Sequence, residues 1–240
     1  MNNFIKFNLN EKLNKSLKNI NFKIPTPIQT ESIPLVLGGK DILGSAQTGT
    51  GKTAAFCIPM IELLMRSSKG SALIMIPTRE LAKQVLDVVH SLLGFKSPIN
   101  TVSLIGGELM SKQLSQLKRR PRIFVGTPGR INDHLERGTL NLHDTNFLVL
   151  DETDRMLDMG FEVQINKILK FVPPKRQTLM FSATIPDNIK KLSTKYLNNP
   201  IRVSVGGENV AAKNIKQEVI ELKSDEKLIE IKKQILKREG

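Results

Sequence analysis

The sequence predicts an α/β protein with an open, mostly parallel sheet and helices on both faces. Short strand-like runs alternate with longer segments of helical periodicity along the 240 residues. Runs such as Leu73–Ile76 and Phe147–Leu150 are apolar throughout, which is typical of parallel strands covered on both faces. In such a sheet, ligands bind at the carboxyl ends of the strands.

The elements are expected in an alternating order. The predicted strands are Asp41–Ala46, Ala72–Pro77, Val102–Ile105, Arg122–Gly126, Phe147–Leu150, Gln177–Phe181 and Ile201–Val205. The predicted helices are Ile28–Leu37, Lys52–Arg66, Arg79–Leu93, Gly129–Glu136, Val163–Phe171 and Pro186–Tyr196. After residues 206–214, which read as a linker, a strand-like run (Ile215–Leu222) and a helix-like run (Asp225–Arg238) follow.

Composition excludes several classes of protein. Hydrophobic residues make up 40% of the chain and charged residues 25%, which permits a buried core. No apolar run approaches the roughly 18 residues of a membrane span, and the N-terminus lacks a secretory pattern. One cysteine, Cys57, and three histidines exclude a disulfide framework and a Cys/His metal cluster. We therefore expect a cytoplasmic protein with no membrane partner. A monomer is also expected, although these observations leave the oligomeric state open.

The chain is strongly basic, with 36 Lys or Arg against 23 Asp or Glu and a net charge of +13. Such an excess favours a polyanionic partner, because binding to phosphates releases counterions. Charge alone is equally compatible with a solvated surface, so the assignment depends on the motifs.

The segment Ala46–Thr53 (AQTGTGKT) follows a predicted strand and opens a predicted helix. It fits a phosphate-binding loop, with alanine in place of the first glycine. Gly49 and Gly51 would let backbone N–H groups surround phosphate oxygens. Lys52 would reach the β- and γ-phosphates, and the Thr53 hydroxyl would bind Mg²⁺. The alternative is a glycine-rich turn with an incidental lysine.

An acidic pair, Asp151-Glu152, stands at the end of an apolar strand. Buried carboxylates need cations or water to satisfy them. Beside a phosphate loop, Asp151 would hold Mg²⁺ and Glu152 would act as general base on the attacking water. The alternative is a strand-end pair that faces solvent.

Seven motifs follow one another along the chain. They are Asn21–Gln29, Ala46–Thr53, Pro77–Leu81, Gly106-Gly107, Thr127–Arg130, Asp151–Asp154 and Ser182–Thr184. In this order they resemble the first RecA-like domain of the DEAD-box ATP-dependent RNA helicases. The stretch Asp154–Phe161 is most similar to the bacterial RhlE group. The resemblance covers residues 4–205 and implies a RecA-like P-loop fold with ATP, Mg²⁺ and RNA as ligands.

The resemblance assigns residues to ATP. These are Phe4, Phe22, Thr26, Gln29, Ala46, Gln47, Thr48, Gly49, Thr50, Gly51, Lys52 and Thr53, with Lys52, Asp151 and Glu152 catalytic. The Gln29 amide would read the adenine edge. Phe22 would face the base, Phe4 would support Phe22, and Thr26 would tie the adenine loop to the phosphate loop. Without the resemblance, Phe22 would more simply be a core residue.

A second set is assigned to the RNA backbone: Thr78, Arg79, Gly106, Gly107, Thr127, Pro128, Gly129 and Arg130. Hydroxyls, N–H groups and arginines suit a ribose-phosphate chain, and glycine permits close approach. Asp154, Ser182 and Thr184 resemble the family's coupling residues, with both hydroxyls expected to hydrogen-bond Asp154.

Some positions depart from the family pattern or suggest structural roles. Thr153 replaces the alanine of the name-giving motif, so tuning rather than loss of activity is expected. Asn21 replaces a glycine and tolerates a positive φ. The run Lys118–Arg122 is expected at a solvated edge and Cys57 in the core. The three histidines, His90, His134 and His143, are expected at the surface.

The expected domains are a RecA-like ATP-binding domain (1–205), a linker (206–214) and the start of a truncated second RecA-like domain (215–240). A C-terminal helix that docks on the first domain is the alternative. Nothing in residues 206–240 resembles the family's arginine-rich motifs, so the chain alone should be weakly active or inactive. Two other functions are weighed: a non-catalytic RNA-binding or regulatory module, and an unrelated P-loop ATPase, which the RNA motifs disfavour.

Overall fold

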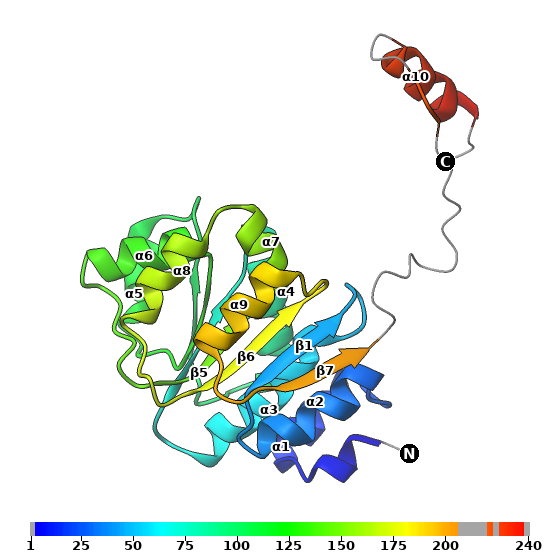
Figure 1. Cartoon of the computed structure of the whole chain (residues 1–240). Coiled ribbons are helices and arrows are strands. Elements are labelled where there is room, and N and C mark those ends of the chain that lie inside the picture. The colour runs from blue at the N-terminus through cyan, green and yellow to red at the C-terminus, as the bar shows by residue number, and fades with distance from the viewer. Residues whose placement is uncertain (1–2, 206–219, 223–225, 238–240) are drawn as a thin grey trace. The chain divides into compact units, whose positions relative to one another are not determined.

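A computed structural model describes residues 3–205, 220–222 and 226–237 (Figure 1). Contacts divide the chain into two units, Met1–Gly207 and Glu208–Gly240. The first unit contains a sheet in the order β3-β4-β2-β5-β6-β1-β7, and every pairing is parallel. The strands are β1 (Ile42–Ala46), β2 (Ser71–Met75), β3 (Thr101–Leu104), β4 (Ile123–Gly126), β5 (Thr145–Leu150), β6 (Gln177–Ser182) and β7 (Ile201–Val205). The predicted fold class is confirmed.

Helices cover both faces of the sheet (Figure 1). One face carries α1 (Glu11–Asn19), α2 (Pro27–Leu37), α3 (Lys52–Arg66) and α4 (Arg79–Leu93). The other carries α5 (Met110–Leu117), α6 (Pro128–Glu136), α7 (Thr153–Asp158), α8 (Glu162–Leu169) and α9 (Asp187–Tyr196). A short 3₁₀ helix, η1 (Asn3–Phe7), precedes α1.

The continuous apolar strands supply both cores, because successive side chains point to opposite faces. In β2, Ile74 joins the core beneath α1–α4, whereas Leu73 and Met75 join the core beneath α6–α9. In β5, Val149 and Leu150 divide in the same way. This division explains why these runs do not alternate with polar residues.

The strand order decides which loops meet. Because β1, β5 and β6 are neighbours, the phosphate loop, Asp151-Glu152 and Ala183-Thr184 emerge together at one part of the carboxyl edge. Because β2, β3 and β4 are neighbours, the loops that begin at Pro77, Gly106 and Thr127 emerge together beside them. Two candidate sites therefore lie along one edge of the sheet.

In the first unit, all seven predicted strands and all six predicted helices are present, with ends shifted by a few residues at most. The elements η1, α1, α5 and α7 were not predicted. Helix α1 is mostly polar in sequence, and Leu13 and Leu17 are its only apolar residues. Both are fully buried, so tertiary packing rather than local pattern defines this helix. The Asn10 side chain caps it by accepting a hydrogen bond from the Lys12 amide, at 2.9 Å.

In the second unit, α10 spans Lys227–Lys237, within the predicted helix. Its large apolar side chains, Leu228, Ile229, Ile231, Ile235 and Leu236, are exposed. The predicted strand Ile215–Leu222 lies mostly outside the described residues, and residues 220–222 are not in a strand. Among the helices that the structure describes, none has the length and apolar character needed to cross a membrane.

Candidate functional site

The phosphate-loop segment connects β1 to α3. Gly49 (φ 81°) and Gly51 (φ 91°) both adopt left-handed backbone conformations, which glycine tolerates best. Gly51 is the N-cap of α3, and Lys52 is its first residue. The buried Lys52 Nζ donates a hydrogen bond to the Ala46 carbonyl at 2.8 Å. The ammonium is thereby held inside the loop, at the carboxyl end of β1.

The acidic pair stands where β5 ends. Asp151 is only 6% exposed. Burial raises the pKa of Asp151 to about 6, although the charge of Lys52 acts in the opposite direction. The Glu152 N–H donates to Asp151 Oδ1 at 3.0 Å, and Glu152 adopts φ 51° at the start of α7. Its carboxylate forms a 3.4 Å ion pair with Arg155.

The phosphate loop and the acidic pair line one cleft of about 360 Å³. Its polar lining includes Lys52, Thr53, Asp151 and Glu152, and α4 contributes an apolar wall that includes Val85. Among the described residues, no three His, Cys, Asp or Glu side chains gather as a metal-binding cluster. A hydroxyl and one carboxylate nevertheless suit Mg²⁺, which is usually completed by phosphate oxygens and water.

Two of the predicted adenine residues, Gln29 and Thr26, lie next to this loop. Gln29, which is 3% exposed, accepts a hydrogen bond from the Thr26 N–H at 3.0 Å and donates to the Gly51 carbonyl at 3.2 Å. Gln29 therefore links α2 to the phosphate loop by a hydrogen bond. The link expected of Thr26 stays a prediction. The Phe4 and Phe22 rings stack with centroids 6.2 Å apart, as expected if Phe4 supports Phe22. Asn21 has φ 59°, so the expected positive φ is confirmed.

A second cleft, of about 610 Å³, lies at the ends of β2, β3 and β4. Six of the predicted RNA residues line it: Thr78, Arg79, Gly106, Thr127, Gly129 and Arg130. A Cβ on Gly106 or Gly107 would lie 2.9 or 2.5 Å from the Arg79 guanidinium. The two glycines thus allow this arginine to lie directly on the backbone. Pro128 is buried in the first turn of α6.

The structure also shows a connection behind this cleft that the sequence did not suggest. His134 was predicted at the surface, which is wrong: it is fully buried on the inner face of α6. Its Nε2 lies 2.8 Å from Gln113 Oε1, and Gln113 Nε2 donates to the Ile105 carbonyl at 2.8 Å. The pair ties α6 to the residue before Gly106. Its only sequence signal is the position of His134 between the apolar residues Ile131 and Leu135.

Burial and the neighbouring charge of Arg130 lower the pKa of His134 below its ordinary value of 6.5. The folded chain therefore favours neutral His134, whereas the unfolded chain takes up a proton near pH 6.5. We expect the contribution of His134 to the free energy of unfolding to fall below pH 6.5, by up to about 1.4 kcal/mol per pH unit. The raised pKa of Asp151 acts in the opposite direction in this range, so the contribution is read from the difference between variants. Urea denaturation at pH 7.5 and 5.5 would measure it. His134→Gln should reduce this dependence and His90→Asn should not; equal slopes in all three proteins would contradict the assignment.

Asp154 connects α7 to the segment after β6. Its Oδ2 accepts hydrogen bonds from the Thr184 N–H at 3.0 Å and the Thr184 hydroxyl at 2.9 Å. The Ser182 hydroxyl accepts from the Asp154 N–H at 3.3 Å. Burial acts to raise the pKa of Asp154, but the hydrogen bonds from Thr184 outweigh it and lower that pKa. These hydrogen bonds join the helix that follows the acidic pair to Thr184.

Thr153, the departure from the family motif, is fully buried between β5 and β6. Its hydroxyl lies 3.2 Å from the Leu150 carbonyl and 3.1 Å from the Phe181 carbonyl and can donate to either. We expect Thr153→Ala to lower the free energy of unfolding by about 1 kcal/mol, because this bond is lost. Thr153→Ser should retain most of it. Urea denaturation of the three proteins would test this, and a serine variant as unstable as the alanine variant would contradict it.

The family comparison agrees with this geometry. The DEAD/DEAH box helicase family matches residues 26–192, which include the phosphate loop, the acidic pair and Ser182–Thr184. The chain belongs to this family. A DEAD/DEAH box helicase assignment accounts for the ordered motifs and for the two clefts at one edge of the sheet.

The helicase relatives include the ATP-dependent RNA helicase CshA of Listeria monocytogenes, 45% identical over 95% of this chain and 44% of that protein. The ATP-dependent RNA helicase DeaD of Mycobacterium tuberculosis is 42% identical over 91% of this chain and 39% of its own length. This chain thus spans less than half of either relative. The finer resemblance to the RhlE group stays a prediction.

A solved structure has the same fold. The crystal structure of a DEAD box protein from the hyperthermophile Methanococcus jannaschii is 38% identical, with a TM-score of 0.80. The match covers 97% of this chain and 63% of that chain. The RecA-like expectation for the sheet is therefore confirmed.

Proposed function

We propose that this chain is the ATP-binding half of an ATP-dependent RNA helicase. The observation that carries the proposal is one cleft lined by Lys52, Thr53, Asp151 and Glu152, with Asp154 next along the chain and bonded to Thr184. A second cleft with the predicted RNA residues lies along the same edge of the sheet. The two ligands would therefore bind to neighbouring loops of a single sheet.

The residues that line the first cleft would have separate roles in ATP hydrolysis. Lys52 would leave the Ala46 carbonyl and neutralise the β- and γ-phosphates. Thr53 and Asp151 would hold Mg²⁺, mostly through water, and the ion would neutralise charge on the phosphates. Glu152 would orient the attacking water and accept its proton. Its position before the first residue of α7, among the residues that line the cleft, supports this role.

The second cleft would hold an RNA backbone. Thr78 and Thr127 would supply hydroxyls, Arg79 and Arg130 positive charge, and Gly106-Gly107 a surface that the backbone can approach. Hydrolysis would be coupled to RNA through Asp154 and Thr184, because both follow the strands that end at the ATP cleft. Local separation of an RNA duplex would result once a second domain completes the RNA-binding site.

A second RecA-like domain would complete the enzyme. We place a linker at 206–214 and the start of that domain at 215–240, which agrees with the division of contacts at Gly207. In related phosphoryl transfers, an arginine from a partner contributes roughly 10³–10⁵ in rate. The chain alone is therefore expected to bind ATP but hydrolyse it slowly. We further propose a monomer that works in the cytoplasm.

Steady-state ATP hydrolysis with and without single-stranded RNA tests the proposal, after ATP binding has been verified. The chain alone should show no appreciable stimulation by RNA, and adding the second RecA-like domain of a relative in trans should produce it. ATP and RNA binding with no hydrolysis under any such addition would favour the regulatory module instead. Strong stimulation of the chain alone would mean that the arginine expected from the second domain is supplied from elsewhere, such as a second copy of this chain.

A further inference from the structure

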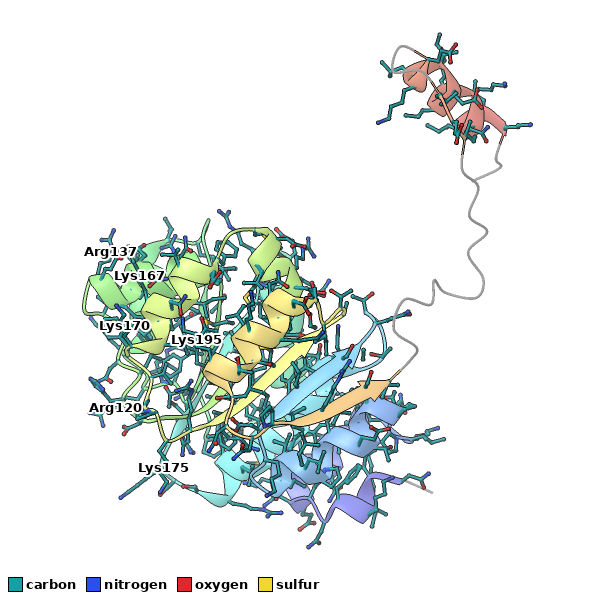
Figure 2. All side chains as sticks on the ribbon, in the orientation of Figure 1. Arg120, Arg137, Lys167, Lys170, Lys175 and Lys195 are labelled. Carbon is teal, nitrogen blue, oxygen red and sulfur yellow. The ribbon has the colours of Figure 1, made fainter. Side chains whose placement is uncertain are left out.

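The last part of the first unit is unusually basic. Residues 163–205 contain eight Lys or Arg and a single acidic residue, Asp187. Figure 2 shows six cationic side chains along one flank of this unit, which we call the lateral basic surface. Its members are Arg120, Arg137, Lys167, Lys170, Lys175 and Lys195. None of them belongs to the two clefts described above.

Contacts between helices bring these residues onto one surface. Lys167 on α8 forms a 3.6 Å ion pair with Glu136 on α6, one residue before Arg137. Lys195 on α9 donates to Asn166 on α8 at 2.6 Å. Arg120 precedes β4 and Lys175 precedes β6, so both lie at the amino ends of parallel strands. The surface thus reaches the edge of the sheet opposite the ATP and RNA clefts.

Part of this charge is not neutralised within the protein. Arg137 pairs with Asp133 at 2.5 Å, and Lys167 pairs with Glu136. Arg120, Lys170, Lys175 and Lys195 have no carboxylate within 4.0 Å among residues 3–205, 220–222 and 226–237. All four are exposed. Such cations gain most from a polyanion, because binding releases counterions without breaking internal ion pairs.

A cleft of about 850 Å³ adjoins the surface at Arg120. Lys69, Thr139 and Asn141 also line it, with Asp144 as its one acidic residue. Arg122 also lines this cleft, but its guanidinium already donates hydrogen bonds to the carbonyls of Leu64, Lys69 and Gly70. The run Lys118–Arg122 was expected at a solvated edge. Within it, Arg122 stabilises the fold through hydrogen bonds to three carbonyls, and Arg120 lines the cleft.

We propose that the lateral basic surface binds the phosphate backbone of a double-stranded RNA segment that adjoins the strand held in the RNA cleft. The contact would be independent of sequence, since lysines and arginines on phosphates carry no base information. Phe171, 43% exposed and next to Lys170, gives a frayed base a ring to stack on. RNA is favoured over a membrane because the proposed function already brings RNA to this unit, which raises its local concentration.

The inference rests on the proposed function. Two RNA ligands distinguish a failure of the inference from a failure of the proposed function. A ten-nucleotide single strand reports on the RNA cleft, and a hairpin with the same single-stranded extension reports on both surfaces. The surface variant is Lys170→Glu/Lys175→Glu. The matched control is Lys15→Glu/Lys18→Glu on α1, where both lysines are also exposed and the net charge changes equally.

The surface variant of the 240-residue chain should bind the hairpin about tenfold more weakly at 100 mM salt, with a salt slope lower by about 2. The control variant should bind the hairpin like the unmodified chain, and all three should bind the short strand equally. Lys170→Gln/Lys175→Gln should give an intermediate loss, which separates charge from any effect on folding.

Equal hairpin affinity in the surface and control variants would overturn the inference. So would binding to phosphatidylserine vesicles that the surface variant loses while it keeps hairpin affinity, which would indicate a membrane instead. If the unmodified chain fails to bind the short strand but binds the hairpin through this surface, the inference stands and the assignment of the RNA cleft fails.

Discussion

Replacing Glu152 by glutamine is expected to reduce RNA-stimulated ATP hydrolysis by about 10²- to 10⁴-fold when the second RecA-like domain is supplied. The amide keeps the shape of the side chain but cannot accept the proton of the attacking water. ATP binding should change little, because Lys52, Thr53 and the loop amides that would hold the phosphates are untouched. Phosphate release and equilibrium binding of a fluorescent ATP analogue would measure the two effects separately.

The matched control is Glu162→Gln, the same change at an exposed glutamate on α8. It should leave both hydrolysis and binding unchanged. Survival of hydrolysis in the Glu152 variant would mean that another group activates the water. Loss of ATP binding in that variant would mean that Glu152 has a structural role, for example through its ion pair with Arg155.

Replacing Gly51 by alanine should have the second large effect. The new Cβ would lie 2.4 Å from Gln29 Nε2 and 3.1 Å from Thr26 Oγ1, at a backbone φ of +91°. The methyl group would displace Gln29 from the Gly51 carbonyl and strain the loop. We expect ATP affinity to fall about tenfold or more and the free energy of unfolding to fall by about 2 kcal/mol. Analogue binding and urea denaturation would measure these losses.

Gly49→Ala is the matched control, because Gly49 has a similar φ of +81° but no atom within 4 Å of an added Cβ. Backbone strain alone should lower the stability of this variant by about 1 kcal/mol. The difference between the variants isolates the steric contact with Gln29. Equal losses of stability would show that this contact has no effect beyond backbone strain.

Three links surround the cleft that we propose for ATP, and they would communicate its occupancy through the domain. Gln29 joins α2 to the phosphate loop, Thr153 bridges β5 and β6, and Asp154 holds Thr184. Each link crosses between segments that are distant in sequence. Nucleotide binding that moves Lys52 or Asp151 would therefore also shift the first turn of α2 and the segment after β6.

Much of the fold was predictable because its signals are local. The helices Lys52–Arg66 and Arg79–Leu93 begin and end as predicted, since each follows a strand and has a long apolar face. The central strands β2 and β5 were recognisable because burial on both faces favours uninterrupted apolar residues, whereas the edge strands β3 and β7 alternate in burial. By contrast, α1 and α5 have few apolar residues, and packing against the rest of the domain defines them.

The sequence by itself determined the fold class, the family and the residue types of both candidate sites, because these depend on short motifs and local periodicity. Only the tertiary structure decided which motifs meet, since strand order is set by long-range pairing. It also decided that His134 is buried against Gln113, that Thr153 bridges two carbonyls, and that Arg122 is braced while Arg120 is free to face a cleft. The physical reason is the same in each case: a polar side chain acquires its partner from residues that are far away in sequence and brought close by packing.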